Sequence, residues 1–398
     1  MRSLLVVALT VGARALRLSP APIMRESAAP AASPLFSRRN LLAGGAAAAI
    51  GAAGVKLLKP STPLFLPAAS SMAGETVVIT GANTGLGFES ALRLAAAGAL
   101  VVVTARTAAK AQSAVEALRA ELGEAGAGAQ FVALPIDLAD LASVAAFPAA
   151  LQRALGDGVA VDVLLNNAGV MAIPTRTETA DGLERQLGVN HVGHFALVAA
   201  LMPALERAKR GFRVINVSSD AHRLASAKAM SAAVDASLDP ADYTPWGNYA
   251  LSKAANVLFT KELQRRMTRA GVKGSAVALH PGAVNTDLGR FLFADSASGG
   301  LEAVVAGKPL TQLYTPDPRT TAVVNAALGT FLLSTDQGAN TQVWLAAAAD
   351  AGGDLTAHGG LYYDDLAAVR PNPMTEDEQL AQRLWEETAR LAKTDIKF

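Results

Sequence analysis

The chain has 398 residues, of which 51% are hydrophobic, a formal net charge of +1 and no cysteine. The near balance of charges gives no sign of the basic patch that a nucleic-acid partner would need, and a chain without cysteine has no disulfides, thiolate nucleophiles or cysteine-ligated zinc. The length suits one large domain or two small ones, and the apolar content is enough for a sizeable core.

Residues 1–74 differ in composition from the rest, because they are rich in Ala, Ser, Pro and Arg and contain few acids. "MRSLLVVALTVGARA" has the basic start, short apolar run and small residues of a secretory signal peptide. "SRRNLLAGGAAAAIGAAG" (Ser37–Gly54) resembles a twin-arginine signal, and Ser71–Ala73 offers small residues for cleavage. We therefore expect residues 1–74 to be a targeting leader.

Two signals in series resemble the leader of an algal plastid protein, which predicts a plastid location and, for the twin-arginine segment, the thylakoid. One alternative is a membrane anchor at residues 41–66, although glycines, lysines and a proline interrupt that run. The other alternative is a disordered tail.

After the leader, short apolar runs alternate with helical stretches. In chain order the expected strands are 76–80, 100–105, 130–136, 161–169, 212–219 and 274–282. The expected helices between them are 87–99, 108–122, 138–155, 182–209 and 248–263. This alternation predicts an α/β fold with a doubly wound parallel sheet (Rossmann fold), formed by residues 75–398 as a single domain. Its active site should lie outside the carboxyl ends of the strands.

A glycine-rich turn, "TGANTGLG" (Thr80–Gly87), separates the first strand from its helix. Gly81 would permit the tight turn, while Gly85 and Gly87 would let a pyrophosphate approach the backbone at the helix N-terminus. Arg106 follows the second strand, roughly 20 residues past the glycines, where an NAD site would carry an acidic residue. Because an arginine can pair with a 2′-phosphate, the pattern predicts NADP(H) as cofactor.

The segment "NYALSKAANVLFTKEL" (Asn248–Leu263) predicts one amphipathic helix that carries Tyr249 and Lys253 one turn apart on one face. The ammonium group beside the phenol should lower the pKa of Tyr249 from its reference value near 10. Such a tyrosine can give a proton to a carbonyl oxygen as hydride reaches the carbon, or take the proton back. Ser218 and Ser219 end the fifth expected strand. A serine there takes part in catalysis only if another catalytic side chain reaches it.

In this order the motifs resemble the short-chain dehydrogenase/reductase family over about residues 75–391. The motifs that carry the resemblance are TGxxxGxG, Asp137, "NNAG" (Asn166–Gly169), Asn190, Ser219, Tyr249, Lys253 and "HPGAVNT" (His280–Thr286). "TADGLERQLGVNHVGHF", "NVSSDAHR", "SKAANVLF" and "GGLYYDD" are most similar to the retinol-dehydrogenase and protochlorophyllide-reductase branch.

The resemblance implies a role for each matching residue. Tyr249 would be the acid/base, Lys253 would lower its pKa and hold the nicotinamide ribose, and Asn190 would help hold a water of the proton relay. Ser219 would polarise the substrate oxygen, with Ser218 as the alternative. The implied cofactor-binding residues are Gly81, Asn83, Thr84, Gly85, Leu86, Gly87, Arg106, Asp137, Leu138, Asn166, Ala168, Gly169, Tyr249, Lys253, Val284 and Thr286. No metal site is expected, because the neighbouring His191 and His194 have no acidic third ligand at a metal-site spacing.

We therefore expect an NADP(H)-dependent oxidoreductase acting on the alcohol or carbonyl group of a small molecule, similar to retinol dehydrogenases. One alternative is protochlorophyllide reductase, although this chain lacks the cysteines that such enzymes usually carry near the substrate. The other is a catalytically weak NADP-binding sensor or import subunit, against which the intact Asn–Ser–Tyr–Lys set argues.

Three further expectations concern surfaces. The apolar stretch Gly289–Tyr314 indicates either a hydrophobic substrate and a membrane-facing mouth, or packing against the core or another subunit. The insertion between Ser219 and Tyr249 should border the substrate pocket. The resemblance also implies a homodimer formed through the helices that hold Asn190 and Tyr249.

Overall fold

The structure is a computed structural model that describes residues 62–235, 239–284, 333–347 and 358–398. All the described residues lie in the compact unit Gly45–Phe398. The predictions for residues 1–61, Thr286 and Gly289–Tyr314 concern residues outside these ranges.

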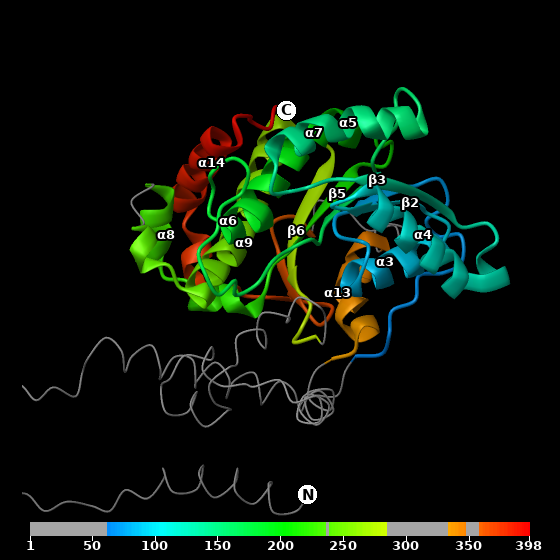
Figure 1. Cartoon of the computed structure of the whole chain (residues 1–398), viewed down its shortest axis with the longest axis horizontal. Helices are drawn as coiled ribbons and strands as arrows, with labels where there is room; N and C mark the ends of the chain where they lie inside the picture. Colours follow the sequence, from blue (N-terminus) through cyan, green and yellow to red (C-terminus); the bar gives the residue numbers. More distant parts are fainter. Residues whose placement is uncertain (1–61, 236–238, 285–332, 348–357) are drawn as a thin grey trace, which may run out of the picture. The chain divides into compact units, whose positions relative to one another are not determined.

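An eight-stranded sheet with the order β3-β2-β1-β4-β5-β6-β7-β8 forms the middle layer (Figure 1). The strands are β1 (Thr76–Ile79), β2 (Leu100–Ala105), β3 (Gln130–Pro135), β4 (Val163–Asn166), β5 (Phe212–Val217), β6 (Gly274–His280), β7 (Tyr362–Asp364) and β8 (Ala367–Val369). Neighbours from β3 to β7 pair in parallel, and β8 pairs antiparallel with β7. The predicted doubly wound fold is confirmed, with a short antiparallel edge added.

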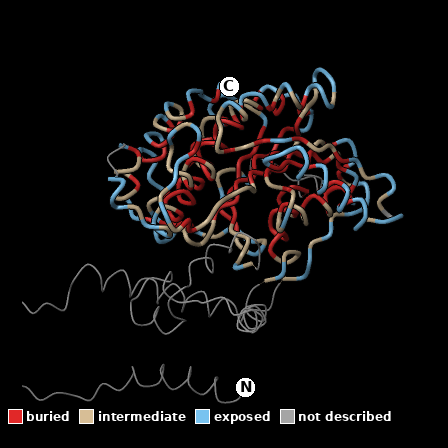
Figure 2. The backbone as a smooth tube through the Cα atoms, viewed as in Figure 1, coloured by how far each residue is buried: buried red, intermediate tan, exposed pale blue. Residues whose placement is uncertain are grey.

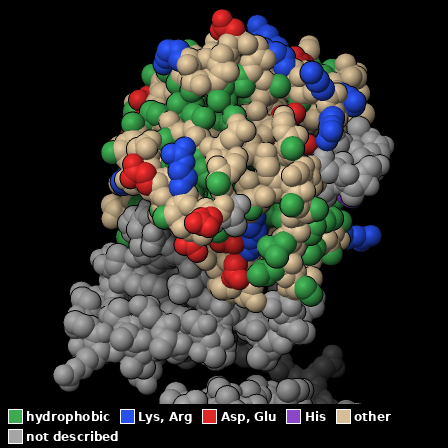
Figure 3. All heavy atoms as spheres, turned by 90° about the vertical axis from the view of Figure 1, so that its right-hand side faces the viewer, with side chains coloured by type: hydrophobic (Ala, Val, Ile, Leu, Met, Phe, Trp, Pro, Cys, Tyr) green, Lys and Arg blue, Asp and Glu red, His purple; other side chains and the backbone are tan. Residues whose placement is uncertain are grey.

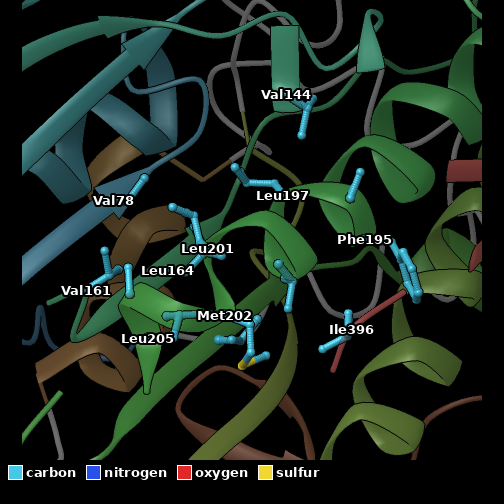
Figure 4. Packing of buried hydrophobic residues seen from close by; sticks show 14 of the residues in the cluster. Val78, Val144, Val161, Leu164, Phe195, Leu197, Leu201, Met202, Leu205 and Ile396 are labelled. Carbon is cyan, nitrogen blue, oxygen red and sulfur yellow. The ribbon is translucent and has the colours of Figure 1, made fainter. Parts of the chain in front are cut away.

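Alternate residues of each strand face opposite helical layers. The row Val78, Val102, Leu164, Val214 and Ala276 runs across five strands and packs against one layer. Figure 4 labels two members of this row, Val78 and Leu164, among the residues of the same cluster. That layer consists of α5 (Leu141–Leu155), α7 (Gly193–Leu205), α9 (Pro245–Ala270) and α14 (Glu378–Ala392). The other layer consists of α3 (Gly85–Ala96), α4 (Ala108–Leu122) and α13 (Thr335–Ala347). Buried backbone therefore fills the middle of the domain and exposed backbone its rim (Figure 2).

The expected helix 182–209 is instead a composite of three pieces. α6 (Arg185–Leu187) leads into a π-helical turn, η2 (Gly188–Val192), which continues as α7. The stretch Arg185–Leu205 is long and apolar enough to cross a membrane by length and composition, but 72% of its most apolar window is buried inside the domain. It is therefore the central core helix of this domain.

Residues 62–74 pack onto the domain, although the sequence suggested that the domain begins at 75. Met72 is fully buried against α3 and β1, and its N–H donates to the carbonyl of Ala97 (2.9 Å). The amide of Asn340 on α13 accepts from the N–H of Phe65 (2.6 Å) and donates to the carbonyl of Pro63 (3.1 Å). The packed region thus begins no later than residue 62, and the expected cleavage stretch Ser71–Ala73 lies within it.

The insertion before Tyr249 forms α8 (Ala227–Val234), which packs away from Tyr249, whereas the end of the insertion brings Trp246 against the Tyr249 ring. Met230 and Val234 join Leu251, Ala255 and Leu258 of α9 and Leu380 and Leu384 of α14 in one apolar cluster. This face of α9 is the one opposite Tyr249. α14 also packs on α7, one of the two helices through which a dimer was expected. On the face shown in Figure 3, basic and acidic side chains are interspersed, as the near-neutral net charge suggests.

Candidate active site

The motifs converge at the carboxyl ends of three adjacent strands. The glycine turn follows β1, the NNAG loop follows β4 and the serine pair follows β5, and these strands are neighbours in the order β1-β4-β5. Because the strands are parallel, their carboxyl ends meet at one edge of the sheet. α9 packs against β5 and β6 and brings Tyr249 and Lys253 to the same edge.

The glycine turn leaves the N-terminus of α3 open. Gly81 and Gly85 have positive φ values of 65° and 57°, which favour glycine. Thr84 makes no side-chain cap at this terminus and the first turn holds no acid, whereas Thr107 and Asp140 cap α4 and α5. The free N–H groups of α3, flanked by Asn83 and Leu86, suit a pyrophosphate, so the turn fits a dinucleotide.

Glycine is required at position 87 for a reason other than the expected one. A Cβ at Gly87 would lie 2.5 Å from the carbonyl oxygen of Gly81 and 2.6 Å from Nδ2 of Asn167. Gly87 is therefore needed for close packing of α3 on its own turn, and not only for the approach of a ligand.

The NNAG loop is fixed to the glycine turn by Thr80. The hydroxyl of Thr80 accepts from the N–H groups of Asn167 and Ala168, both at 2.9 Å, and Nδ2 of Asn167 donates to the carbonyl of Thr80 (2.9 Å). Asn166 is 1% exposed and donates to Asn216 on β5 (2.8 Å), so its side chain joins two strands and does not line a cleft. Ala168 and Gly169 carry the loop toward the catalytic residues.

Tyr249, Ser219 and Lys253 form a compact group. The Ser219 side chain acts on the Tyr249 hydroxyl and lowers its pKa, and the Lys253 Nζ lies 5.7 Å from the centre of the Tyr249 ring. Lys253 Nζ donates to the carbonyl of Val217 (2.9 Å). Ser218 is turned away, since its hydroxyl donates to the carbonyl of Lys253 (2.7 Å). Of the two serines, Ser219 is thus the one that reaches Tyr249.

Burial dominates the ionisation of this group. Burial raises the pKa of Tyr249 to about 12, although the hydrogen bond with Ser219 lowers it. Burial also lowers the pKa of Lys253 to about 8. The expectation that Lys253 brings the pKa of Tyr249 below 10 is wrong for the chain by itself, because burial disfavours the charged phenolate by more than Ser219 favours it.

Asn190 lies in the π-helical turn, a feature often found at functional sites. Its side chain accepts from the N–H of Val170 (2.8 Å) and donates to the carbonyl of the same residue (2.9 Å) and to Ser252 (2.9 Å). A Cβ at Gly169 would lie 3.2 Å from Asn190 Oδ1 and 3.5 Å from Lys253 Nζ. Asn190, the NNAG loop and Lys253 are therefore in contact range.

The remaining candidates lie around this centre. Arg106 is exposed at the end of β2, which is tied to the glycine turn by the bond from Ala82 N–H to the Thr104 carbonyl (2.9 Å). Asp137 accepts from the N–H of Ala139 (2.9 Å), so its carboxylate caps its own turn, and Leu138 is buried. Val284 packs beside Leu86, because a Cβ at Gly338 would meet both side chains.

Some residues that build the site had no predicted role, although Thr80 and Asn167 belong to the predicted motifs. Asn167 and Thr80 hold the loop to the turn, and His194 bonds to both Thr80 and Asn190. The signal for His194 was its spacing of four residues from Asn190, which places both on one helix face. His191 instead bonds Asn256 and Thr388, and among the described residues no three His, Asp or Glu side chains gather as for a metal ion.

Comparison with known proteins agrees with this geometry. The family model for short chain dehydrogenases matches residues 75–233. Retinol dehydrogenase 13 of Homo sapiens is 35% identical over 353 residues, which cover 89% of this chain and 95% of that protein. Polyprenol dehydrogenase of Mus musculus is 36% identical over 327 residues, which cover 80% and 84%. A crystal structure of an uncharacterised protein from Mycobacterium Paratuberculosis has a TM-score of 0.56 at 31% identity and covers 83% of this chain and 100% of that one.

The chain therefore belongs to the short-chain dehydrogenase/reductase family, as its motifs suggested. Within that family it is retinol-dehydrogenase-like. It is an oxidoreductase that uses a nicotinamide cofactor and acts on the alcohol or carbonyl group of a small molecule.

Proposed function

We propose that the chain is an NADP(H)-dependent oxidoreductase that interconverts an apolar alcohol and its carbonyl compound, with Tyr249 as the acid/base. The observation that carries the proposal is that Ser219 acts on the hydroxyl of Tyr249, whose buried ring lies beside the buried ammonium of Lys253. A site built only to bind a cofactor has no need of this phenol.

Each side chain of the group has a distinct task. The cofactor, when bound, supplies or accepts the hydride. The Ser219 hydroxyl donates to the substrate oxygen and polarises it. Tyr249 gives its proton to that oxygen in reduction and takes it back in oxidation. The Lys253 ammonium stabilises the phenolate that Tyr249 leaves behind, which is where its charge is most useful.

Arg106 supports NADP(H) over NAD(H). It follows β2 directly, at the position where an NAD site would place a carboxylate for the ribose 2′-hydroxyl. Its exposed guanidinium is free of the sheet and can pair with a 2′-phosphate through two parallel hydrogen bonds.

An apolar substrate is supported by the surroundings of Tyr249. The ring of Trp246 meets the ring of Tyr249 edge to face, with centres 6.0 Å apart, and Trp246 stays 36% exposed. An exposed tryptophan beside the proton donor provides an apolar wall. Two relatives are named for apolar alcohols, retinol and polyprenol.

The test follows nicotinamide absorbance in the dark with the chain from Thr62 to Phe398, NADPH or NADH, and aldehydes that include retinal. We expect turnover with NADPH that is lost in Tyr249→Phe, since the variant keeps the ring and removes the proton. Arg106→Ala should weaken NADPH binding by roughly 10- to 100-fold and leave NADH binding unchanged.

Two results would contradict the proposal. Full turnover in Tyr249→Phe would remove the acid/base assignment, and equal use of NADH by the unaltered chain would remove the role of Arg106. Turnover that requires light and protochlorophyllide would favour the tetrapyrrole alternative.

A further inference from the structure

The imidazole of His194 lies between two parts of the active site. His194 is 2% exposed on α7, one turn beyond Asn190. Its Nδ1 lies 3.0 Å from the carbonyl oxygen of Asn190, and its Nε2 lies 2.9 Å from the hydroxyl of Thr80. One ring therefore spans from the π-helical turn to the end of β1.

The partners fix which nitrogen carries the proton. A carbonyl oxygen can only accept, so Nδ1 must be the N–H donor to Asn190. Nε2 of the neutral ring is then an acceptor, and the Thr80 hydroxyl must donate to it. The other acceptor near that hydroxyl, the carbonyl of Leu165, is more distant at 3.4 Å.

The direction of this hydrogen bond determines how the lone pairs of the Thr80 hydroxyl are used. Its proton points to His194, so both its lone pairs are free for the N–H groups of Asn167 and Ala168. A protonated ring would turn an N–H toward Thr80, whose lone pairs are already used. Burial lowers the pKa of His194 to about 3, which agrees with a ring kept neutral.

The loop after β4 is consequently held from two sides by one network. Thr80 holds its start at Asn167 and Ala168, and the Asn190 side chain holds Val170 by two hydrogen bonds. His194 joins these two anchors. The loop in turn carries Gly169 beside Lys253.

We propose that His194 is a positioning residue that fixes the glycine turn, the NNAG loop and Asn190 in one arrangement for the cofactor. The inference deepens the proposed function, but it rests only on nicotinamide-cofactor binding and not on the substrate or on the preference for NADP(H). Thr80 and His194 should then act on cofactor affinity through their shared hydrogen bond.

A double-mutant cycle tests this coupling. The dissociation constants of NADPH and NADH are measured by fluorescence, without substrate, for Thr80→Val, His194→Phe and the double variant. We expect each single substitution to weaken binding about 10-fold. The double variant should be no weaker than the poorer single one, because both substitutions break the same link. A double variant weakened by the product of the two single effects would overturn the proposal.

Two polar variants separate the two ends of the ring and guard against a folding failure of His194→Phe. The amide of His194→Gln can reach the place of Nε2, and that of His194→Asn the place of Nδ1. We expect His194→Gln, which loses only the bond to Asn190, to bind the cofactor more tightly than His194→Asn, which loses the bond to Thr80 and should bind about as poorly as His194→Phe. Equal loss in both polar variants would show that the link to Thr80 is not what matters.

His191→Phe is the matched control. His191 is 1% exposed in the same helical stretch, but its ring bonds Asn256 and Thr388 and not the loop. We expect it to lower the melting temperature as much as His194→Phe does while leaving cofactor affinity unchanged. A loss of affinity that follows the loss of melting temperature in both variants would indicate a merely structural role. A chain that prefers NADH would contradict the assignment of Arg106 and leave this test intact.

Discussion

Burial has the largest effect on the ionisation of both Tyr249 and Lys253. Each residue is only 3% exposed, and burial favours the neutral form of each side chain. Tyr249 therefore holds its proton, with a pKa of about 12, and is ready to act as an acid in reduction. Lys253, with a pKa of about 8, is the member of the pair that changes charge near physiological pH.

The pH dependence of reduction follows from Lys253. Below pH 8 its ammonium is present and can stabilise the phenolate, and above pH 8 the charge is lost. We expect kcat/KM for carbonyl reduction at saturating cofactor to be level from pH 6 to 7.5 and to fall above about pH 8. The buried rings of His191 and His194 should not contribute, since their pKa values of about 4 and 3 keep them neutral. A rate that stays level to pH 10 would show that Lys253 keeps its ordinary pKa.

At this scale the sequence could supply the residue types but not their surroundings. The spacing of Tyr249 and Lys253 predicted that they share a helix face, which the structure bears out. Spacing carries no information on burial, so the direction of the Tyr249 pKa shift was missed. The choice between Ser218 and Ser219 depended on which hydroxyl faces the Tyr249 side chain and which bonds the backbone of α9, and only coordinates give that direction.

Among the elements, long and strongly patterned segments were predictable and short or irregular ones were not. The parallel strands β1 to β6 follow continuous apolar runs, and their helices follow regular spacing. β7 and β8 have three residues each, too few to show a period. The π-helical turn shifts the register of the core helix without any change in hydrophobicity, so a pattern cannot reveal it.

The contact between α3 and the glycine turn makes a prediction about Gly87. Alanine in a helix is normally favoured over glycine by about 1 kcal/mol. At Gly87 its methyl group would instead lie 2.5 Å from the backbone oxygen of Gly81, and α3 would have to move. We expect Gly87→Ala to cost about 1–3 kcal/mol of stability and at least roughly 10-fold in cofactor affinity.

Gly128→Ala is the control for that substitution. A Cβ at Gly128 meets no atom within 4 Å in the described part of the chain, and no positive φ strains it. Thermal unfolding and cofactor titration should be unchanged in Gly128→Ala. A Gly87→Ala variant that binds and melts like this control would disprove the packing role.

For the whole molecule, the structure joins segments that are far apart in sequence. α14 packs on α7 and α9, and residues 62–74 pack on α3 and α13. The composition of residues 1–74 suggested a single leader, because small and apolar residues are common both in a cleaved leader and in a segment that packs on a domain. Residues 62–74, called the strap below, are such a packed segment. We propose that residues 1–61 direct the chain to a plastid, and that the mature chain keeps residues 62–74.

The test of that boundary compares two chains, one beginning at Thr62 and one beginning at Glu75. The shorter chain loses Met72, whose burial alone is worth about 2–3 kcal/mol, together with the bonds from Asn340 to Pro63 and Phe65. We expect it to melt roughly 5 °C lower. N-terminal sequencing of the protein from its source cells should find a start at or before Thr62, and a start at Gly74 or Glu75 would contradict the proposal.

A pair of substitutions separates packing from chain length. Met72 is fully buried, whereas Leu66, in the same segment, is 68% exposed. Met72→Ala should therefore cost about 2–5 kcal/mol in unfolding free energy, because it leaves a cavity between the strap and α3. Leu66→Ala removes a side chain that remains in water and should have no measurable effect. Equal melting temperatures for the two variants would mean that residues 62–74 lie loosely on the surface, and the leader would then be free to end at residue 74.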